Sequence, residues 1–308
     1  MSLTIIPFDE GEAHLDWLDL CAAFKAGHEL PRAEIADTFL YRGDDTLLNR
    51  SAWIDGMGIA VKCATIFPGN PEKGDPRING AVNLYDDANG TLAALVDFHL
   101  VTKWKTAGDS LYAATRLARP DSENILIVGA GTVGRSLWQA YAAAFPGARF
   151  RVWNRTRANA EAMAADCPGL RVADDLERAV RDADIVASAT MATEPLIKGD
   201  WLQPGQHIDL IGAFRPDMRE ADDEALRRAR IFVDSYDTTI GHIGEIRIPL
   251  DSGAITRDDL VADYYAPDAF KRRSDDEITL FKNGGGAHLD LMTSRYILDA
   301  WRGGVSRR

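Results

Sequence analysis

The sequence has few cysteines and no long apolar run, and these two absences limit its class. None of its apolar runs reaches the roughly 18 to 20 residues that span a bilayer, and the beginning MSLTIIPFDEGEAHLDW lacks the pattern of a signal peptide. The three cysteines, Cys21, Cys63 and Cys167, are far apart and show no CxxC or Cys/His clustering of a zinc site. We therefore expect a cytoplasmic protein with reduced, mostly buried thiols, no metal and no membrane partner.

Positive charge is also scarce. The net charge is −12, and the 308 residues contain no long basic block; the terminal SRR is one short basic stretch. Such a chain repels a phosphate backbone, so we exclude nucleic acid as a partner. Hydrophobic residues make up 46% and charged residues 27%, which is ordinary for a globular protein. The length suits two domains, and a two-domain enzyme with a small-molecule substrate is the natural expectation.

The first third of the chain reads as a helix and then an antiparallel sheet, and a second helix follows. The helix is predicted over residues 101–118, where Trp104, Leu111 and Leu117 fall near one stripe before Arg119-Pro120. The strands are short β-rich runs separated by Gly, Asn and Asp turns. They are predicted at residues 45–54, 58–67, 80–87 and 91–100.

Strands and helices alternate after residue 119, which predicts a parallel, doubly wound sheet. Strands are predicted at 124–131, 148–156, 184–190, 207–213 and 230–235, and helices at 132–145, 157–167, 175–183 and 222–229. The chain then ends in a helix that could return to the first domain. The predicted fold class is α/β, with a Rossmann nucleotide-binding domain at 119–287. The predicted smaller α+β domain, for substrate binding and dimerisation, comprises 1–118 and 288–308.

The stretch ILIVGAGTVGRS carries the GxGxxG pattern at Gly129, Gly131 and Gly134. It follows a predicted strand and opens a predicted helix, where the three glycines permit the turn, the approach of a pyrophosphate and close helix packing.

The second strand ends in Asn154, Arg155, Thr156 and Arg157, without the carboxylate that usually binds the ribose of NAD. Two guanidiniums favour NADP(H), although NAD(H) is possible and both arginines could simply be solvated.

A reductase of small acids needs cations for a carboxylate and a source of a proton. Lys62 lies in an apolar strand, where an ammonium must be either paired or functional. Lys105 opens the linking helix, and Arg50 and Arg42 belong to the preceding strand. We assign all four to the substrate, and Lys62 and Lys105 also to catalysis.

Five stretches in order resemble the ornithine cyclodeaminase/mu-crystallin family over most of the chain from about residue 40. They are AVKCATIFPGNPEKGDP, LVTKWKTAGDSLYAATRLARP, ILIVGAGTVG, LIGAFRPDMREADDEALRRARIFVDS and DEITLFKNGGGAHLD. The resemblance implies an inserted Rossmann domain, a homodimer, and a substrate-site lysine at Lys62. It also implies that Lys105 replaces the usual carboxylate-binding arginine, which loses the bidentate fork.

Phe214 stands where cyclodeaminases of this family carry an acidic residue. A phenyl ring cannot exchange protons, so we expect reduction of a ready-made cyclic imine, such as 1-pyrroline-2-carboxylate or 1-piperideine-2-carboxylate, to proline or pipecolate. Two alternatives stay open: a lyase of the ornithine cyclodeaminase or hydroxyproline dehydratase type, and a non-catalytic protein that binds NADPH or a small ligand.

The remaining candidates are weaker. Phe214 and Asp217 are placed in the catalytic centre, although Asp217 could instead cap a turn. His242, Glu245 and His288 could donate protons but could equally be structural, and Asp109 could neutralise Lys105. The predicted cofactor contacts are Thr106, Gly129, Ala130, Gly131, Thr132, Val133, Gly134, Asn154, Arg155, Thr156, Arg157, Ala189, Thr190, Met191, Gly212, Phe214, Asn283, Gly284 and Gly285.

Overall fold

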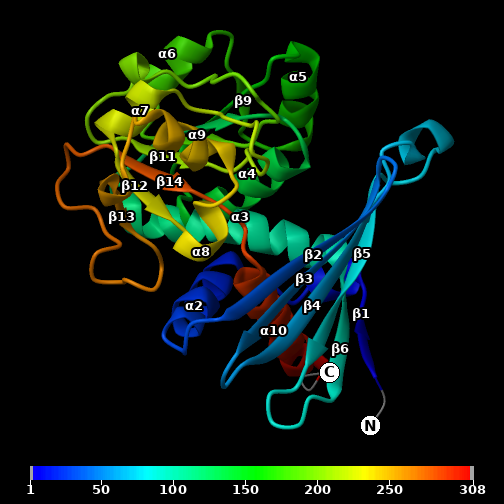
Figure 1. Cartoon of the computed structure of the whole chain (residues 1–308). Coiled ribbons are helices and arrows are strands. Elements are labelled where there is room, and N and C mark those ends of the chain that lie inside the picture. Colours follow the sequence, from blue (N-terminus) through cyan, green and yellow to red (C-terminus); the bar gives the residue numbers. More distant parts are fainter. Residues whose placement is uncertain (1–2, 306–308) are drawn as a thin grey trace. The chain divides into compact units, whose positions relative to one another are not determined.

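The computed structural model describes residues 3–305, so the terminal SRR lies outside the described residues. The chain forms two compact units (Figure 1). Unit 1 contains the residues up to Lys105 and those from Gly286 onward, and unit 2 extends from Thr106 to Gly285. Within residues 3–305, no helix combines the length and the apolar character that a membrane span requires.

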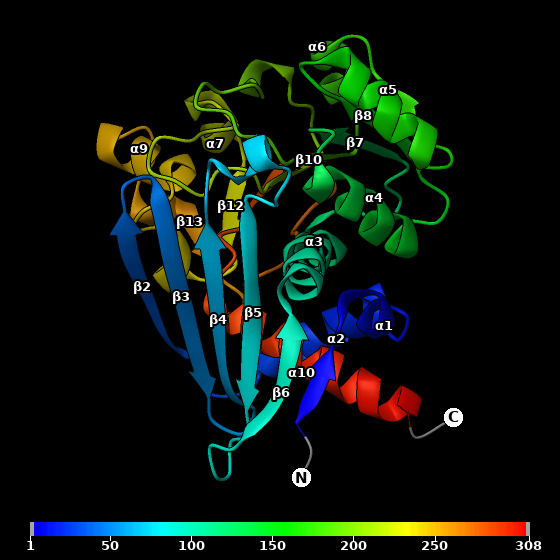
Figure 2. The same cartoon turned by 90° about the vertical axis from the view of Figure 1, so that its right-hand side faces the viewer.

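Unit 1 is built on a six-stranded sheet, in which the strands lie side by side (Figure 2). The strand order is β1-β6-β5-β4-β3-β2, and all neighbours are antiparallel except β1 and β6. The four predicted strands are confirmed, whereas β1 and β2 were missed. Strand β1 is very short, and the sequence of β2, EIADTFLYR, shows no regular alternation of apolar and polar residues. The bounds are β1 Thr4–Ile6, β2 Glu34–Arg42, β3 Asp45–Ile54, β4 Gly58–Ile66, β5 Ile78–Tyr85 and β6 Leu92–Asp97.

Helices α2 (Trp17–His28) and α10 (Ala287–Val305) pack on one face of this sheet (Figure 1). The C-terminal helix therefore does return to the N-terminal part of the chain. Unit 1 also contains the short helices α1 (Phe8–Glu12) and η1 (Asn70–Lys73). Leu20 and Phe24 of α2 are fully buried in the core.

Helix α3 (Phe98–Leu117) begins three residues before the predicted start at Val101. The strand predicted to reach residue 100 ends at Asp97 instead, because the Asp97 carboxylate accepts a hydrogen bond from the Leu100 amide at 2.9 Å and so caps the helix.

Unit 2 contains an eight-stranded sheet, parallel throughout, in the order β13-β12-β14-β11-β10-β7-β8-β9. The predicted doubly wound sheet is confirmed. Its central strands are buried along almost their whole length, as expected for a sheet covered on both faces. The bounds are β7 Asn124–Val128, β8 Arg149–Trp153, β9 Arg171–Val172, β10 Ile185–Ser188, β11 His207–Leu210, β12 Arg230–Val233, β13 Leu260–Ala262 and β14 Thr279–Lys282.

The four predicted helices of unit 2 are all present, and the helices α8 and α9 and the 3-10 helices η2 and η3 were missed. Strands β9, β13 and β14 were missed as well, and β14 occupies a central place in the sheet although its sequence, TLFK, is too short to show a period. The helices are α4 Thr132–Ala144, α5 Arg157–Asp166, α6 Leu176–Arg181, η2 Gly199–Trp201, α7 Asp223–Arg228, α8 Tyr236–Thr239, α9 Gly244–Ser252 and η3 Arg257–Asp259.

The division between the units falls inside α3, at Lys105/Thr106, and again at Gly285/Gly286. The sequence placed these boundaries at 118/119 and 287/288. The end of α3 contributes to unit 2 because two residues of that unit bind its backbone. The Tyr264 hydroxyl donates to the Asp109 carbonyl at 2.8 Å, and Arg272 Nε donates to the Leu117 carbonyl at 2.7 Å.

Candidate functional site

The turn between β7 and α4 needs its glycines for different reasons. Gly129 has a φ of +112°, and a Cβ there would lie 2.6 Å from the Ala189 carbonyl oxygen. A Cβ at Gly134 would clash with the Gly129 carbonyl oxygen. At Gly131, by contrast, a Cβ would meet nothing within 4 Å. Gly129 and Gly134 therefore allow tight packing, while Gly131 leaves room above the turn.

Gly131 is also the N-cap residue of α4, a helix of 13 residues. The N-terminal end of such a helix carries partial positive charge and amides that attract an anion. The turn itself is held by Asn154, whose Oδ1 accepts the Ala130 amide at 3.1 Å and whose Nδ2 donates to the Thr156 carbonyl at 2.9 Å. The geometry fits the pyrophosphate of a dinucleotide.

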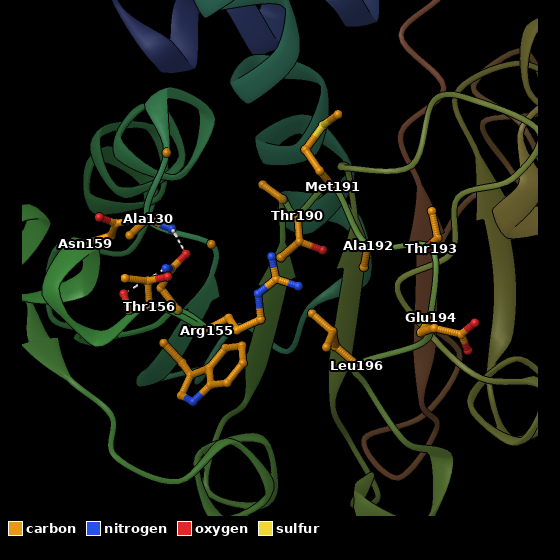
Figure 3. A pocket seen from close by; sticks show the side chains of 15 residues that line it. Ala130, Arg155, Thr156, Asn159, Thr190, Met191, Ala192, Thr193, Glu194 and Leu196 are labelled. Carbon is orange, nitrogen blue, oxygen red and sulfur yellow. Dashed lines mark hydrogen bonds between the residues drawn. The ribbon is translucent and has the colours of Figure 1, made fainter.

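A pocket of about 490 Å³ opens in front of this turn (Figure 3). Arg155 and Thr156 line it from the end of β8, and the segment from Ala189 to Leu196 lines it after β10. Nine of the predicted cofactor residues line the pocket: Gly129, Ala130, Gly131, Asn154, Arg155, Thr156, Ala189, Thr190 and Met191. Six further lining residues were missed: Trp153, Asn159, Ala192, Thr193, Glu194 and Leu196. Extending the two predicted strand-end segments by a few residues would have found most of them.

Other predicted cofactor residues do not line this pocket. Thr132, Val133 and Gly134 belong to α4, and Phe214 and Gly285 also lie outside the lining. Gly212 is pressed against the Thr190 backbone and Gly284 against Thr239 Oγ1, where a Cβ would clash at each position. Asn283 Nδ2 donates to the Thr106 carbonyl and to Ser110 Oγ, both at 3.0 Å. These residues belong to unit 2 but lie outside the lining of this pocket.

Arg157 does not line the pocket either, which corrects its assignment to a phosphate. Its guanidinium is exposed and pairs with Asp174, and with Glu161 at 2.7 Å. Hydrogen bonds from Arg157 to these carboxylates, Asp174 first, raise the pKa of the guanidinium. Two carboxylates therefore neutralise Arg157, and Arg155 is the arginine that points into the pocket (Figure 3).

In unit 1, Lys62 is buried and is held by contacts with three residues. Its Nζ donates to Asp290 Oδ1 at 2.9 Å and to Thr102 Oγ1 at 2.8 Å, and it lies 4.7 Å from the centre of the Phe98 ring. Burial lowers the pKa of Lys62 from 10.5 to about 8, although the Asp290 charge acts in the opposite direction. Lys62 was predicted to be either paired or functional, and the pairing is present.

Asp290, on α10, was missed because its partner Lys62 lies 228 positions away in the sequence. Burial would raise the pKa of Asp290, but Lys62, Lys105 and Arg50 hold it below its usual value. Arg50 also binds Asp37, its cross-strand neighbour, with Nη2 and Oδ2 3.0 Å apart. The Asp290 carboxylate is thus surrounded by three cations, and cations of this kind suit a substrate that carries a carboxylate.

The position of Arg42 in the sheet corrects its assignment to the substrate. In antiparallel pairs, residues opposite each other share a face of the sheet. Arg50 opposes Asp37 and Lys62, whereas Arg42 opposes Asp45 on the other face. The Arg42 side chain is 80% exposed and pairs with Asp45 at 2.9 Å, so we no longer assign it to the substrate.

The weaker candidates for a proton donor are described by their burial and their hydrogen-bond partners. Burial, followed by the Lys105 charge, lowers the pKa of His288 to about 3, so the ring stays neutral near pH 7. The buried Glu245 accepts the amides of Glu220 at 2.7 Å and Ala221 at 3.1 Å. His242 is exposed, and Asp109 Oδ1 accepts the Tyr264 hydroxyl at 2.7 Å.

Asp217 caps no helix, because the N-cap of α7 is Asp222. Asp217 instead accepts two hydrogen bonds from Arg215, both at 2.9 Å, and the hydrogen bond from Arg215 lowers the pKa of the exposed carboxyl group. It is therefore poorly suited to donate a proton. Phe214 is 53% exposed, and the Arg215 guanidinium lies 5.8 Å from the centre of its ring. Its contact with a nicotinamide stays a prediction.

A doubly wound sheet that carries a GxGxxG turn beside such a pocket defines a dinucleotide-binding protein. The chain belongs to the ornithine cyclodeaminase/mu-crystallin family, whose model matches residues 52–305. It is 50% identical over 300 residues to a Delta(1)-pyrroline-2-carboxylate reductase of Paracoccus denitrificans, covering 95% of each chain. It is 35% identical over 248 residues to the ketimine reductase mu-crystallin of Mus musculus, covering 80% of this chain and 77% of the mouse protein.

Among solved structures, an archaeal alanine dehydrogenase dimer with bound NAD superposes with a TM-score of 0.89 at 25% identity. The match covers 99% of this chain and 98% of the dehydrogenase chain. The fold class and the family inferred from sequence motifs are thus confirmed.

The open space above Gly131 allows a direct test. We expect Gly131→Ala to fold normally, because its φ of −84° suits alanine, and to weaken dinucleotide binding by about tenfold, because a methyl group there occupies the place of the pyrophosphate. Titration of protein fluorescence with NADH and NADPH measures this. Gly147→Ala is the matched control, since it also adds a methyl group to open space, outside the pocket. Equal affinities in both variants would contradict the assignment.

Proposed function

We propose that this chain is an NAD(P)H-dependent reductase of cyclic ketimines. It converts 1-pyrroline-2-carboxylate or 1-piperideine-2-carboxylate to proline or pipecolate. The observation that carries the proposal is the buried lysine Lys62, held by Asp290 and Thr102 within a group of cations. The identity of 50% to a pyrroline-2-carboxylate reductase, over nearly the whole of both chains, supports the same substrate class.

The residues of unit 1 act on the substrate. Lys105 and Arg50 bind its carboxylate, and the Lys62 ammonium polarises the imine nitrogen. A lysine with a pKa near 8 releases a proton more readily than an ordinary lysine, so Lys62 protonates the nitrogen as the C=N bond becomes a C–N bond. Asp290 holds the ammonium in place and stabilises its charge.

The pocket of unit 2 binds the dinucleotide. When bound, the reduced nicotinamide supplies the hydride that the imine carbon accepts. Phe214 stands in place of the acidic residue of the cyclodeaminases. The reduction of a preformed imine does not require an acidic residue at this position. Adding one hydride and one proton to the C=N bond completes the amine, and no ammonia is released.

The test is an assay of nicotinamide absorbance with both imines and the purified full chain. We expect oxidation of the reduced dinucleotide with at least one imine and none with ornithine. Ammonia release from ornithine, or water release from hydroxyproline, without net dinucleotide turnover would identify a lyase instead. Dinucleotide binding without turnover of any imine would identify a binding protein.

The lowered pKa of Lys62 predicts a basic limb in the pH profile. Lys62 is protonated below pH 8, so kcat/KM should fall about tenfold per pH unit above that value as the proton is lost. Asp290 raises the pKa of Lys62, so Asp290→Asn should move this limb to lower pH. Asp45→Asn, which removes a partly buried carboxylate paired with Arg42, is the control and should leave the limb in place. A limb that stays unchanged in Asp290→Asn would belong to another group or to the substrate.

We further propose that NADP(H) is preferred to NAD(H). Arg155 points into the pocket, and the end of β8 offers no carboxylate that would repel a 2′-phosphate. Arg155→Ala should therefore raise the KM for NADPH by about tenfold and change that for NADH little. Separate titrations with the two reduced dinucleotides measure this. Equal KM changes for both would contradict the preference.

A homodimer is also proposed. The related alanine dehydrogenase is described as a dimer. In this chain Leu40, Tyr41 and Trp53 on β2 and β3 are 59%, 72% and 49% exposed, and a second copy of the chain would cover such apolar surface. Sedimentation of the purified chain determines the state.

A further inference from the structure

The wall of the dinucleotide pocket is supported from behind by a short segment that does not line it, Arg219–Ala221. The Arg219 amide donates to the Ala192 carbonyl at 3.0 Å. The Glu220 carbonyl accepts the amides of Leu196 and Ile197, both at 2.9 Å, and Ala221 forms a parallel bridge with Ile197. Ala192 and Leu196 line the pocket, so this segment fixes the backbone of its wall.

The side chain of Glu220 joins two strand ends. Its Oε1 accepts Ser188 Oγ at 2.7 Å, the Thr190 amide at 2.7 Å and Thr190 Oγ1 at 2.8 Å. Its Oε2 accepts the Gly212 amide at 2.5 Å. Ser188 ends β10, and Gly212 follows β11. The carboxylate thus ties the ends of two adjacent strands through both of its oxygens.

The two tied loops are in direct contact. A Cβ at Gly212 would clash with the Thr190 backbone, so only a glycine lets the two segments approach this closely. Glu220 itself has no exposed surface. Its own backbone is held in turn, because Glu245 on α9 accepts the Glu220 and Ala221 amides.

The buried carboxylate is compensated by nearby groups. Burial raises the pKa of Glu220, while the Lys282 charge and the hydrogen bonds from Ser188 and Thr190 act against the rise. Lys282 is completely buried on β14, and its Nζ donates to the Leu210 carbonyl at 2.9 Å. Both oxygens of Glu220 accept from backbone amides, which the ionised form does best.

The dinucleotide has a defined polarity over such a sheet. The adenosine lies at the end of the strand after the glycine turn, here β8 with Arg155, and the pyrophosphate lies at Gly131. The other mononucleotide half, with the nicotinamide, belongs to the neighbouring strands on the other side of β7, which are β10 and β11. Thr190 and Met191 line the pocket at that end.

We infer that Glu220 is a positioning residue for the nicotinamide half of the dinucleotide. It acts through Thr190 and Gly212, whose backbones it holds in the arrangement that receives the nicotinamide, and it leaves the adenosine half unaffected. This inference rests on the proposed dinucleotide-dependent function. It means that Glu220, a buried carboxylate outside the pocket, affects the binding of the nicotinamide half of the dinucleotide and not that of the adenosine half.

Glu220→Gln tests the inference, because the amide nitrogen of glutamine faces a backbone N–H wherever it replaces an oxygen. The affinities of the full chain for NADPH, NADH, ADP-ribose and 2′-phospho-ADP-ribose are measured by calorimetry. We expect the variant to bind the reduced dinucleotides about tenfold more weakly and the two fragments without nicotinamide within about twofold of the wild type. The KM for the dinucleotide should rise to the same extent.

Glu277→Gln is the matched control. Glu277 is a largely buried carboxylate of the same unit that accepts the Arg273 amide at 2.6 Å and pairs with Arg230, and it does not line the pocket. It should lower stability without changing any of the four affinities. If Glu220→Gln does not fold, Ser188→Ala removes one hydrogen bond to the same carboxylate and should produce the selective loss at about two- to fivefold.

The outcomes separate the two proposals. Equal losses for whole dinucleotides and fragments, or no loss at all, would overturn the positioning role of Glu220. A wild-type chain that binds neither NADPH nor NADH would overturn the proposed function, and with it this inference. Selective loss of the nicotinamide-containing ligands supports both.

Discussion

A charge removed from water must be matched by fixed partners, and this constraint shapes both halves of the candidate site. Replacing hydration costs several kcal/mol for each buried ion unless hydrogen bonds and opposite charge compensate it. Lys62 meets this condition through Asp290 and Thr102, and Glu220 meets it through two strand-end amides and two hydroxyls. Each set of compensating bonds ties separate elements together, so the same bonds that stabilise the charge also fix the geometry beside a ligand.

The glycines of unit 2 act together with these charges. Gly129 and Gly212 both press against the segment Ala189–Thr190, one from β7 and one from β11. Because neither has a side chain, the ends of three adjacent strands converge closely enough for Glu220 to reach the amides of two of them. A Cβ at Gly131 would meet no atom within 4 Å, and for this reason the pocket stays open at the turn.

Membership of the ornithine cyclodeaminase/mu-crystallin family does not decide the reaction, because the family includes both deaminating and reducing enzymes. The discriminating features are local. Phe214 removes an acidic group, while the cations around Asp290 are retained. The proposed site has cations for a carboxylate and a phenyl ring at position 214 in place of an acid, and this combination suits the reduction of an imine better than the deamination of an amine.

Much of the fold could be predicted from the sequence, because each signal involved is local. The alternation of apolar runs and helical stretches predicted the parallel sheet, and the spacing of Gly129, Gly131 and Gly134 predicted the turn. The missed elements β1, β9 and β14 are too short to show a period. Arg42 and Arg157 were assigned to ligands because the charge of each arginine was considered alone, although Asp45 at i+3 and Glu161 at i+4 already offered local partners.

The sequence by itself determined which chemical groups are present: the glycine turn, the cations, and a phenyl ring in place of an acid. Tertiary structure alone decided which of them meet. Lys62 and Asp290 are 228 positions apart, and Glu220 meets Ser188 across 32 positions. These contacts depend on sheet register and on the return of α10 to the first unit. Local sequence patterns predict neither the sheet register nor the return of α10, because both arise only when distant segments bury their apolar faces together.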